Sequence, residues 1–221
     1  MSEYKITWQG GRSELIEKKS RFIATVSIAN SETEALAFIA SIKKEYSDAN
    51  HNCFAFVIGE NHELQRCSDD GEPSGTAGRP MLDVLLGEGI HNTVVVVTRY
   101  FGGTLLGTGG LVRAYSKATQ AGLKNSTIIL KQHGHLLEMT TDYHGVGKIQ
   151  YLLGQRGLAI THSEYAASVC LEILVPLAQL MEVKETLTEA TNGLITYNKC
   201  NEVYFSMIDG MPHIFTKKEF R

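Results

Sequence analysis

Apolar positions in the first half of the chain follow two periods, one typical of strands and one typical of helices. The strand patterns predict strands over residues 4–8, 53–58, 63–67 and 93–99. Helical spacing predicts helices over residues 31–47 and 79–87 and from Thr108 onward. The run from Thr93 to Thr98 is β-branched throughout and does not alternate, so we expect a strand that is covered on both faces.

The second half of the chain shows the order strand, helix, strand, strand, helix, strand. We expect its strands over residues 136–141, 158–165, 167–175 and 194–207, with helices after Asp142 and over residues 177–190. This βαββαβ order is that of the ferredoxin-like plait. We therefore predict an α+β protein of two domains, residues 1–128 and residues 129–221.

The composition is that of an ordinary globular protein. The 221 residues are 43% hydrophobic and 20% charged, and the formal net charge is −3. That charge argues against a broad basic surface for bulk nucleic acid but leaves local basic patches open. The four cysteines form no CxxC pair, no apolar run reaches membrane-spanning length, and we expect no signal peptide. We expect a reduced, cytoplasmic protein with no membrane partner.

An acidic, glycine-rich loop carries three carboxylates and two hydroxyls, from Asp69, Asp70, Glu72, Ser74 and Thr76. Such oxygens suit Mg²⁺, and a carboxylate among them could serve as a general base. The alternative is a turn whose carboxylates bind loop amides and favour the start of the following helix. The spacing is not that of an EF-hand, so we assign no metal and no cofactor and keep Mg²⁺ as the alternative.

His51 lies close to Cys53 at the start of a predicted strand, a proximity that raises the question of nucleophilic catalysis. Cys53 heads an apolar run, and cysteine is among the most frequently buried residues. We therefore interpret Cys53 as a buried structural thiol and keep His51 as a candidate base.

Two glycine-rich segments after the predicted strand 93–99 are candidates for anion binding. Arg99 ends that strand, followed by Tyr100, Gly102 and Gly103, and can hold a phosphate or carboxylate while the aromatic ring stacks. The alternative for Arg99 is an ion pair with Asp69 or Asp70.

The second segment opens a helix with Gly107, Thr108, Gly109 and Gly110. Unpaired N–H groups at such a helix start attract an anion, and Arg113 one turn further adds a positive charge. The pattern is not a P-loop, because no Lys-Ser or Lys-Thr pair follows the last glycine. Thr108 is a candidate N-cap of this helix.

The chain resembles the YigZ/YvyE family, the bacterial relatives of the eukaryotic IMPACT proteins. The resemblance rests on the segments Ser68–Leu82 and Val94–Tyr115, supported by His51-Asn52-Cys53 and Asp142-Tyr143. It implies an N-terminal IMPACT domain with the left-handed βαβ fold of a small-subunit ribosomal protein and of domain four of elongation factor G. It also implies a C-terminal ferredoxin-like domain similar to domain five of that factor. Eukaryotic IMPACT proteins regulate translation initiation.

Three hypotheses for function follow. The first is a non-enzymatic protein that docks on structured RNA, such as rRNA, tRNA or the ribosome, and modulates translation. Arg99, Arg113 and the N–H groups of residues 107–110 would hold phosphates. The second is an enzyme acting on a phosphate-containing or peptide-like small molecule, with His51 or Asp70 as base. The third is a regulator that binds a protein partner. Catalysis requires the acidic loop, Arg99 and His51 to meet at one pocket, whereas RNA docking requires an exposed ridge.

Overall fold

The computed structural model describes residues 3–215. They divide into two compact units, one running from Glu3 to Leu130 and the other beginning at Lys131. Both units are α+β, as predicted, and each has its own hydrophobic core. None of the helices within this described range is long and apolar enough to cross a membrane.

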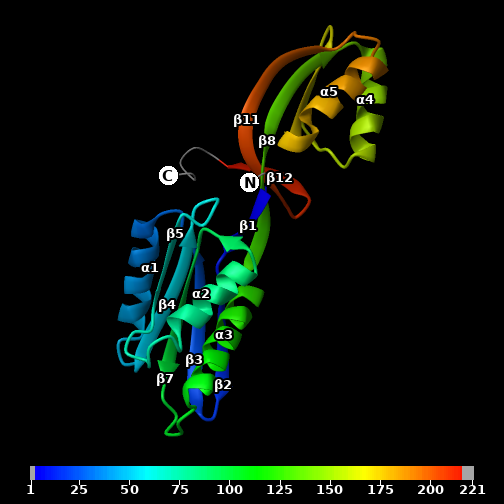
Figure 1. Ribbon diagram of the computed structural model, residues 1–221. Coiled ribbons are helices and arrows are strands. Elements are labelled where there is room, and N and C mark those ends of the chain that lie inside the picture. The colour runs from blue at the N-terminus through cyan, green and yellow to red at the C-terminus, as the bar shows by residue number, and fades with distance from the viewer. Residues whose placement is uncertain (1–2, 216–221) are drawn as a thin grey trace. The chain divides into compact units, whose positions relative to one another are not determined.

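The first unit contains a five-stranded antiparallel sheet and three helices (Figure 1). Its elements are β1 (Glu3–Gln9), β2 (Arg12–Glu17), β3 (Ser20–Ile28), α1 (Glu32–Glu45), β4 (His51–Ile58), β5 (Leu64–Ser68), α2 (Gly78–Gly87), β6 (Ile90–His91), β7 (Thr93–Tyr100) and α3 (Thr108–Lys124). The order across the sheet is β2-β3-β7-β4-β5, and every neighbouring pair is antiparallel. Strands β3 and β4 are consequently parallel to each other and lie on either side of β7.

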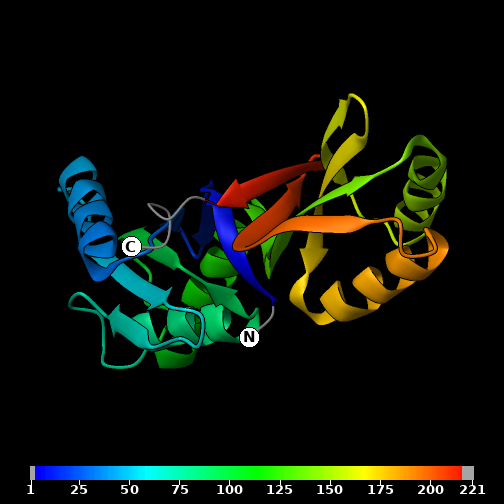
Figure 2. The same ribbon diagram turned by 90° about the horizontal axis from the view of Figure 1, so that it is seen from above.

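The central strand β7 is buried on both faces, which confirms the prediction from its unbroken β-branched run. Val95 and Val97 belong to the core beneath α2 and α3, whereas Val94 and Val96 belong to the core beneath α1. Successive side chains of a strand point to opposite faces, so one valine run supplies both cores. Figure 2 shows α1 on the side of the strands away from α2 and α3.

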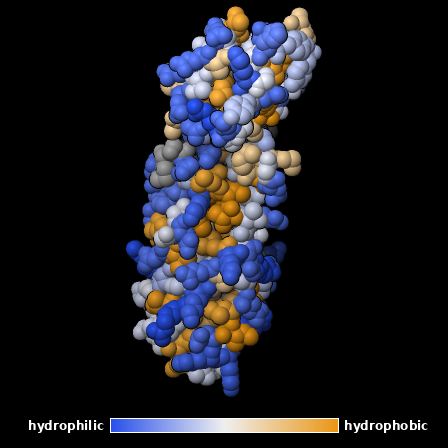
Figure 3. Space-filling model, turned by 90° about the vertical axis from the view of Figure 1, so that its right-hand side faces the viewer, coloured by the Kyte–Doolittle hydropathy of each residue, from blue (hydrophilic) through white to orange (hydrophobic). Residues whose placement is uncertain are grey.

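On the face shown in Figure 3, hydrophobic patches are bordered by hydrophilic residues.

The starts of α1 and α3 are capped in different ways. At α1 the Ser31 hydroxyl accepts a hydrogen bond from the Glu34 N–H, and the Glu34 carboxylate accepts one from the Asn30 N–H. Ser31 and Glu34 therefore form a reciprocal capping box at the start of this helix. At α3 the N-cap is Gly107 with φ +72°, and no side chain caps the helix, so the assignment of Thr108 as N-cap is wrong.

The second unit is the predicted ferredoxin-like plait with one additional strand. Its elements are the part of β8 (Thr127–Thr141) from Lys131 onward, α4 (Tyr143–Gln155), β9 (Ile160–Tyr165), β10 (Val169–Pro176), α5 (Leu180–Ala190), β11 (Thr196–Ile208) and β12 (Met211–Phe215). The antiparallel order β9-β10-β8-β11 is that of the plait, and β12 pairs with β11 as a hairpin. Strand β8 begins well before the predicted residue 136, and β12 lies beyond the last predicted strand.

Candidate functional site

A cavity of about 500 Å³ lies in the first unit, between the acidic loop, the end of β7 and the start of α3. Among its lining residues are five candidates from the sequence analysis, namely His51, Glu72, Arg99, Gly107 and Thr108. Hydrophobic side chains complete the wall, from Pro73, Phe101, Leu105, Leu106 and Leu111. The acidic loop, Arg99 and His51 thus meet at one recess, which is the condition stated above for the enzyme hypothesis, whereas Arg113 does not line it.

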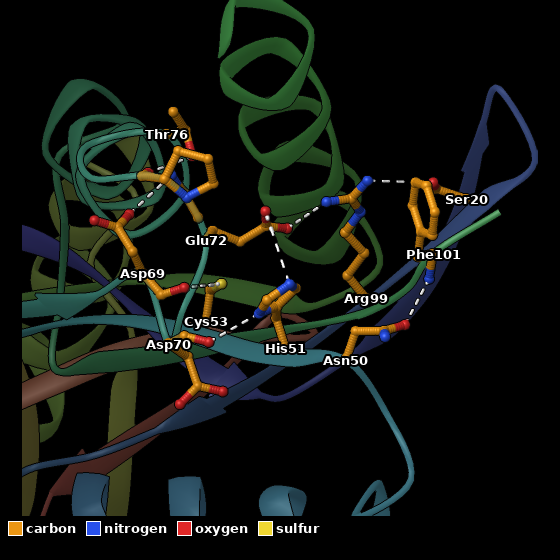
Figure 4. A network of polar contacts seen from close by, with 12 residues as sticks. Ser20, Asn50, His51, Cys53, Asp69, Asp70, Glu72, Thr76, Arg99 and Phe101 are labelled. Atoms are coloured by element: carbon orange, nitrogen blue, oxygen red, sulfur yellow. Dashed lines mark hydrogen bonds and ion pairs between the residues drawn. The ribbon is translucent and has the colours of Figure 1, made fainter. Parts of the chain in front are cut away.

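The carboxylate of Glu72 lies between Arg99 and His51 (Figure 4). Its Oε1 accepts a hydrogen bond of 2.6 Å from Arg99 Nη1 and one of 2.8 Å from the hydroxyl of Tyr115. The side chains of Glu72 and Arg99 are only 3% and 6% exposed. Arg99 therefore forms an ion pair with a loop carboxylate, but its partner is Glu72 rather than Asp69 or Asp70.

His51 is oriented by the backbone of the acidic loop. Its Nδ1 lies 2.9 Å from the carbonyl oxygen of Asp70. Since a carbonyl oxygen only accepts, Nδ1 carries the hydrogen and Nε2 of the neutral ring is left as an acceptor. Nε2 lies 3.9 Å from Glu72 Oε2. Within residues 3–215, neither of these two atoms takes part in a hydrogen bond.

The carboxylates of Asp69 and Asp70 brace the loop. Asp69 accepts hydrogen bonds from the N–H groups of Gly75, Ala77 and Gly78. Burial raises the pKa of Asp69, but these three donors outweigh it and hold the pKa below its usual value. Asp70 accepts hydrogen bonds from the Asn52 N–H and Lys43 Nζ. The carboxylate oxygens of Asp69 and Asp70 therefore already accept hydrogen bonds within the protein. Residues 3–215 contain no group of three His, Cys, Asp or Glu side chains suited to hold a metal ion.

Other candidate residues lie outside the cavity lining. Thr76 donates a hydrogen bond to the Pro73 carbonyl, and the Tyr100 hydroxyl donates one to Asp48. Gly102 lies against the backbone of Lys19, where an added Cβ would come within 2.1 Å of the carbonyl carbon. Ser74, Gly103, Gly109 and Gly110 also lie outside the lining.

Tyr115 was not among the predicted site residues, because in the sequence it has the spacing of a packing residue on a helix. This side chain is fully buried and its hydroxyl contacts both Glu72 and Cys53. Burial raises the pKa of the Cys53 thiol to about 12, even though the Tyr115 hydrogen bond acts in the opposite direction. Cys53 is itself fully buried, as predicted, and no sequence signal distinguishes Tyr115 from a packing residue.

Arg113 belongs to a second, separate feature. A small cavity of about 120 Å³ is lined by Glu17, Lys18, Leu106, Gly110, Arg113, Ala114 and Lys117. The turn between β2 and β3 adds Lys19, whose backbone meets Gly102. We call Lys18, Lys19, Arg113 and Lys117 the cationic surface. All four are exposed, and none forms an ion pair with another described residue.

Comparisons with known proteins agree with the resemblance. The Impact N-terminal domain matches residues 18–123, and a domain of unknown function, DUF1949, matches residues 139–194. IMPACT family member YvyE of Bacillus subtilis is 41% identical over 87% of this chain and 89% of its own length. IMPACT family member YigZ of Escherichia coli is 40% identical over 80% and 87%. The crystal structure of a hypothetical protein is similar with 37% identity and a TM-score of 0.58, covering 89% of this chain and 97% of that one. The chain belongs to the IMPACT family.

Proposed function

We propose that this protein docks on structured RNA, such as rRNA or tRNA, through the cationic surface and thereby modulates translation. The observation that carries the proposal is the gathering of four exposed cations without ion-pair partners among the described residues, at the turn between β2 and β3 and on α3. Unpaired exposed cations are free to contact phosphate oxygens, which supply most of the affinity in RNA and DNA binding.

The start of α3 adds neutral donors beside these cations. The first N–H groups of a helix have no intrahelical partner, and α3 has no capping side chain and no acidic residue in its first turn. Gly110 and Arg113 both line the small cavity of the cationic surface, which has room for a phosphate group. Glu17 lies in the same lining and reduces the local positive charge.

This proposal changes the residues assigned to RNA contact. Arg99 is excluded because its guanidinium is buried and paired with Glu72. Tyr100 is half-buried, and its hydroxyl is bound to Asp48, so a stacking role for this ring is not included. The remaining contacts are few, and the net charge of −3 adds no long-range attraction. We therefore expect weak binding that is sensitive to salt.

Two measurements test the proposal, each at about 50 and 200 mM salt. Co-sedimentation measures binding to ribosomal subunits, and a gel shift measures binding to tRNA. The variant is Arg113→Ala/Lys117→Ala, and the control is Lys44→Ala/Lys124→Ala, which removes two exposed cations elsewhere in the same unit. We expect Arg113→Ala/Lys117→Ala to weaken binding. The slope of log binding constant against log salt concentration should become shallower by about 2, since each phosphate contact contributes about 0.9. Equal binding by both variants, or no binding by the unmodified protein at either salt, would overturn the proposal.

A further inference from the structure

Beyond RNA docking, we propose that the cavity beside His51 and Glu72 binds a small zwitterion of the amino-acid or dipeptide type. In this arrangement the ammonium group contacts His51 and Glu72, and the carboxylate contacts the first turn of α3. An apolar side chain packs on the leucines of the wall. This inference uses other polar side chains than the RNA-docking proposal, namely His51 and Glu72 in place of the cationic surface, although both draw on first-turn N–H groups of α3.

The ammonium position follows from two neighbouring acceptors. His51 Nε2 and Glu72 Oε2 are 3.9 Å apart, and neither receives a hydrogen bond from a described residue. The Glu72 side chain is 3% exposed, so its free oxygen has little water around it and gains from a donor that enters the cavity. An ammonium group carries several hydrogens on one nitrogen and can donate to both acceptors at once.

The charge of the site favours a ligand with no net charge. Arg99 and Glu72 compensate each other through their 2.6 Å contact. A purely cationic or purely anionic ligand would introduce an unbalanced charge into this recess, whereas a zwitterion would not.

The carboxylate position follows from the start of α3. Gly107 and Thr108 line the same cavity as His51 and Glu72. The first-turn N–H groups of α3 lack intrahelical partners, and no side chain caps them. The positive end of the helix dipole adds attraction for an anionic group. Donors and acceptors thus occupy different parts of one cavity, as a molecule with two opposite charges requires.

The wall and the size of the cavity suit an apolar side chain. Leu105 is 82% exposed and Phe101 is 46% exposed, although both line the cavity. Exposed hydrophobic side chains around a recess with a few polar groups are typical of ligand sites. The volume of about 500 Å³ lies in the usual range for small-molecule sites and accommodates a dipeptide.

The experiment titrates the full chain with leucyl-leucine by calorimetry, up to about 10 mM, which detects dissociation constants in the millimolar range. N-acetyl-leucyl-leucine removes the ammonium charge, and leucyl-leucinamide removes the carboxylate. The protein variants are His51→Ala, Glu72→Gln and Leu105→Ala. The control is His162→Ala, at an exposed histidine of the other unit. Thermal unfolding verifies that each variant is folded.

We expect saturable binding of leucyl-leucine that weakens about tenfold or more when either charged group of the peptide is blocked. His51→Ala and Glu72→Gln should weaken it similarly, and His162→Ala should leave it unchanged. Leu105 is too exposed to affect stability, so Leu105→Ala keeps the test valid if Glu72→Gln does not fold. Absence of binding, equal binding of the blocked peptides, or binding unaffected by His51→Ala and Leu105→Ala would each overturn the inference.

Discussion

Arg99 and Glu72 form a buried ion pair that joins the end of β7 to the acidic loop. Arg99 Nη2 also lies 3.4 Å from the Ser20 hydroxyl, which places the guanidinium between β3 and the loop. The rings of Phe22 and Phe101 lie 5.3 and 5.6 Å from the guanidinium carbon. The aromatic rings and the carboxylate together enclose the charge, so the pair holds the floor of the cavity in place.

We predict that Arg99→Ala lowers the free energy of unfolding by about 3–5 kcal/mol, because Glu72 is then left as an uncompensated buried charge. Urea denaturation measures this loss. The matched control is Arg21→Ala, which breaks the exposed pair with Glu14 and should cost less than about 1 kcal/mol. A similar stability for the two variants would contradict the assignment of a buried, compensated pair.

The cysteines should differ sharply in reactivity. Cys53 is fully buried and burial raises its pKa to about 12, so almost no thiolate is present at neutral pH. We predict that iodoacetamide at about pH 7.5 modifies the exposed Cys200 and leaves Cys53 unmodified until the protein is unfolded. Mass spectrometry of peptides identifies the modified residue. Early modification of Cys53 in the native protein would mean that the site opens readily.

Much of the fold could be predicted because its signals are local. The valine run of β7, the capping residues of α1 and the βαββαβ order are each visible in a short stretch of sequence. The short strand β6 was missed because it has two residues and so carries no periodic pattern. Strand β12 was missed because Pro212 and the polar His213 interrupt its alternation.

The site could be predicted only in part, since its contacts join distant segments. His51, Glu72 and Arg99 were each identified as candidates, but their pairing depends on the register of β4 against β7, which places His51 opposite Arg99. Asp69 and Asp70 looked equally available in sequence, yet their oxygens are bound by loop and strand N–H groups. Tyr115 has the spacing of a core residue, so only its buried hydroxyl contacts identify it as part of the site.

The acidic loop should make stability depend on pH through Asp69. Its pKa in the folded protein lies below the unfolded value of about 3.9, so the unfolded state binds more protons between these two values. The contribution is therefore complete above about pH 5 and is lost as the pH falls through the folded pKa.

We predict that Asp69→Asn lowers stability by about 1–3 kcal/mol at pH 7, because an amide cannot accept all three backbone hydrogen bonds. The difference from the unmodified protein should shrink when urea unfolding is measured at about pH 3. Asp83→Asn, at an exposed pair with Arg79, serves as the control and should change little at either pH. A difference that stays constant with pH would show that Asp69 is not stabilised as the charged form.

Two glycines of the glycine-rich loops should respond oppositely to alanine. At Gly102 an added Cβ would lie 2.1 Å from the carbonyl carbon of Lys19, so the turn between β2 and β3 has to move away. We expect Gly102→Ala to lower the melting temperature, at a cost of about 1–3 kcal/mol. At Gly109, in the first turn of α3, the atom nearest to an added Cβ would be Arg113 Nη1, at 3.7 Å.

Gly109→Ala should therefore be neutral or stabilise the protein by up to about 1 kcal/mol, because alanine loses less backbone entropy in a helix. Differential scanning calorimetry of both variants measures the contrast. Because Lys19 belongs to the cationic surface, Gly102→Ala should also weaken RNA docking, whereas Gly109→Ala retains its N–H group and should not. If Gly102→Ala proves as stable as Gly109→Ala, the close approach of the two loops is not a constraint on the fold, and the cationic surface does not depend on it.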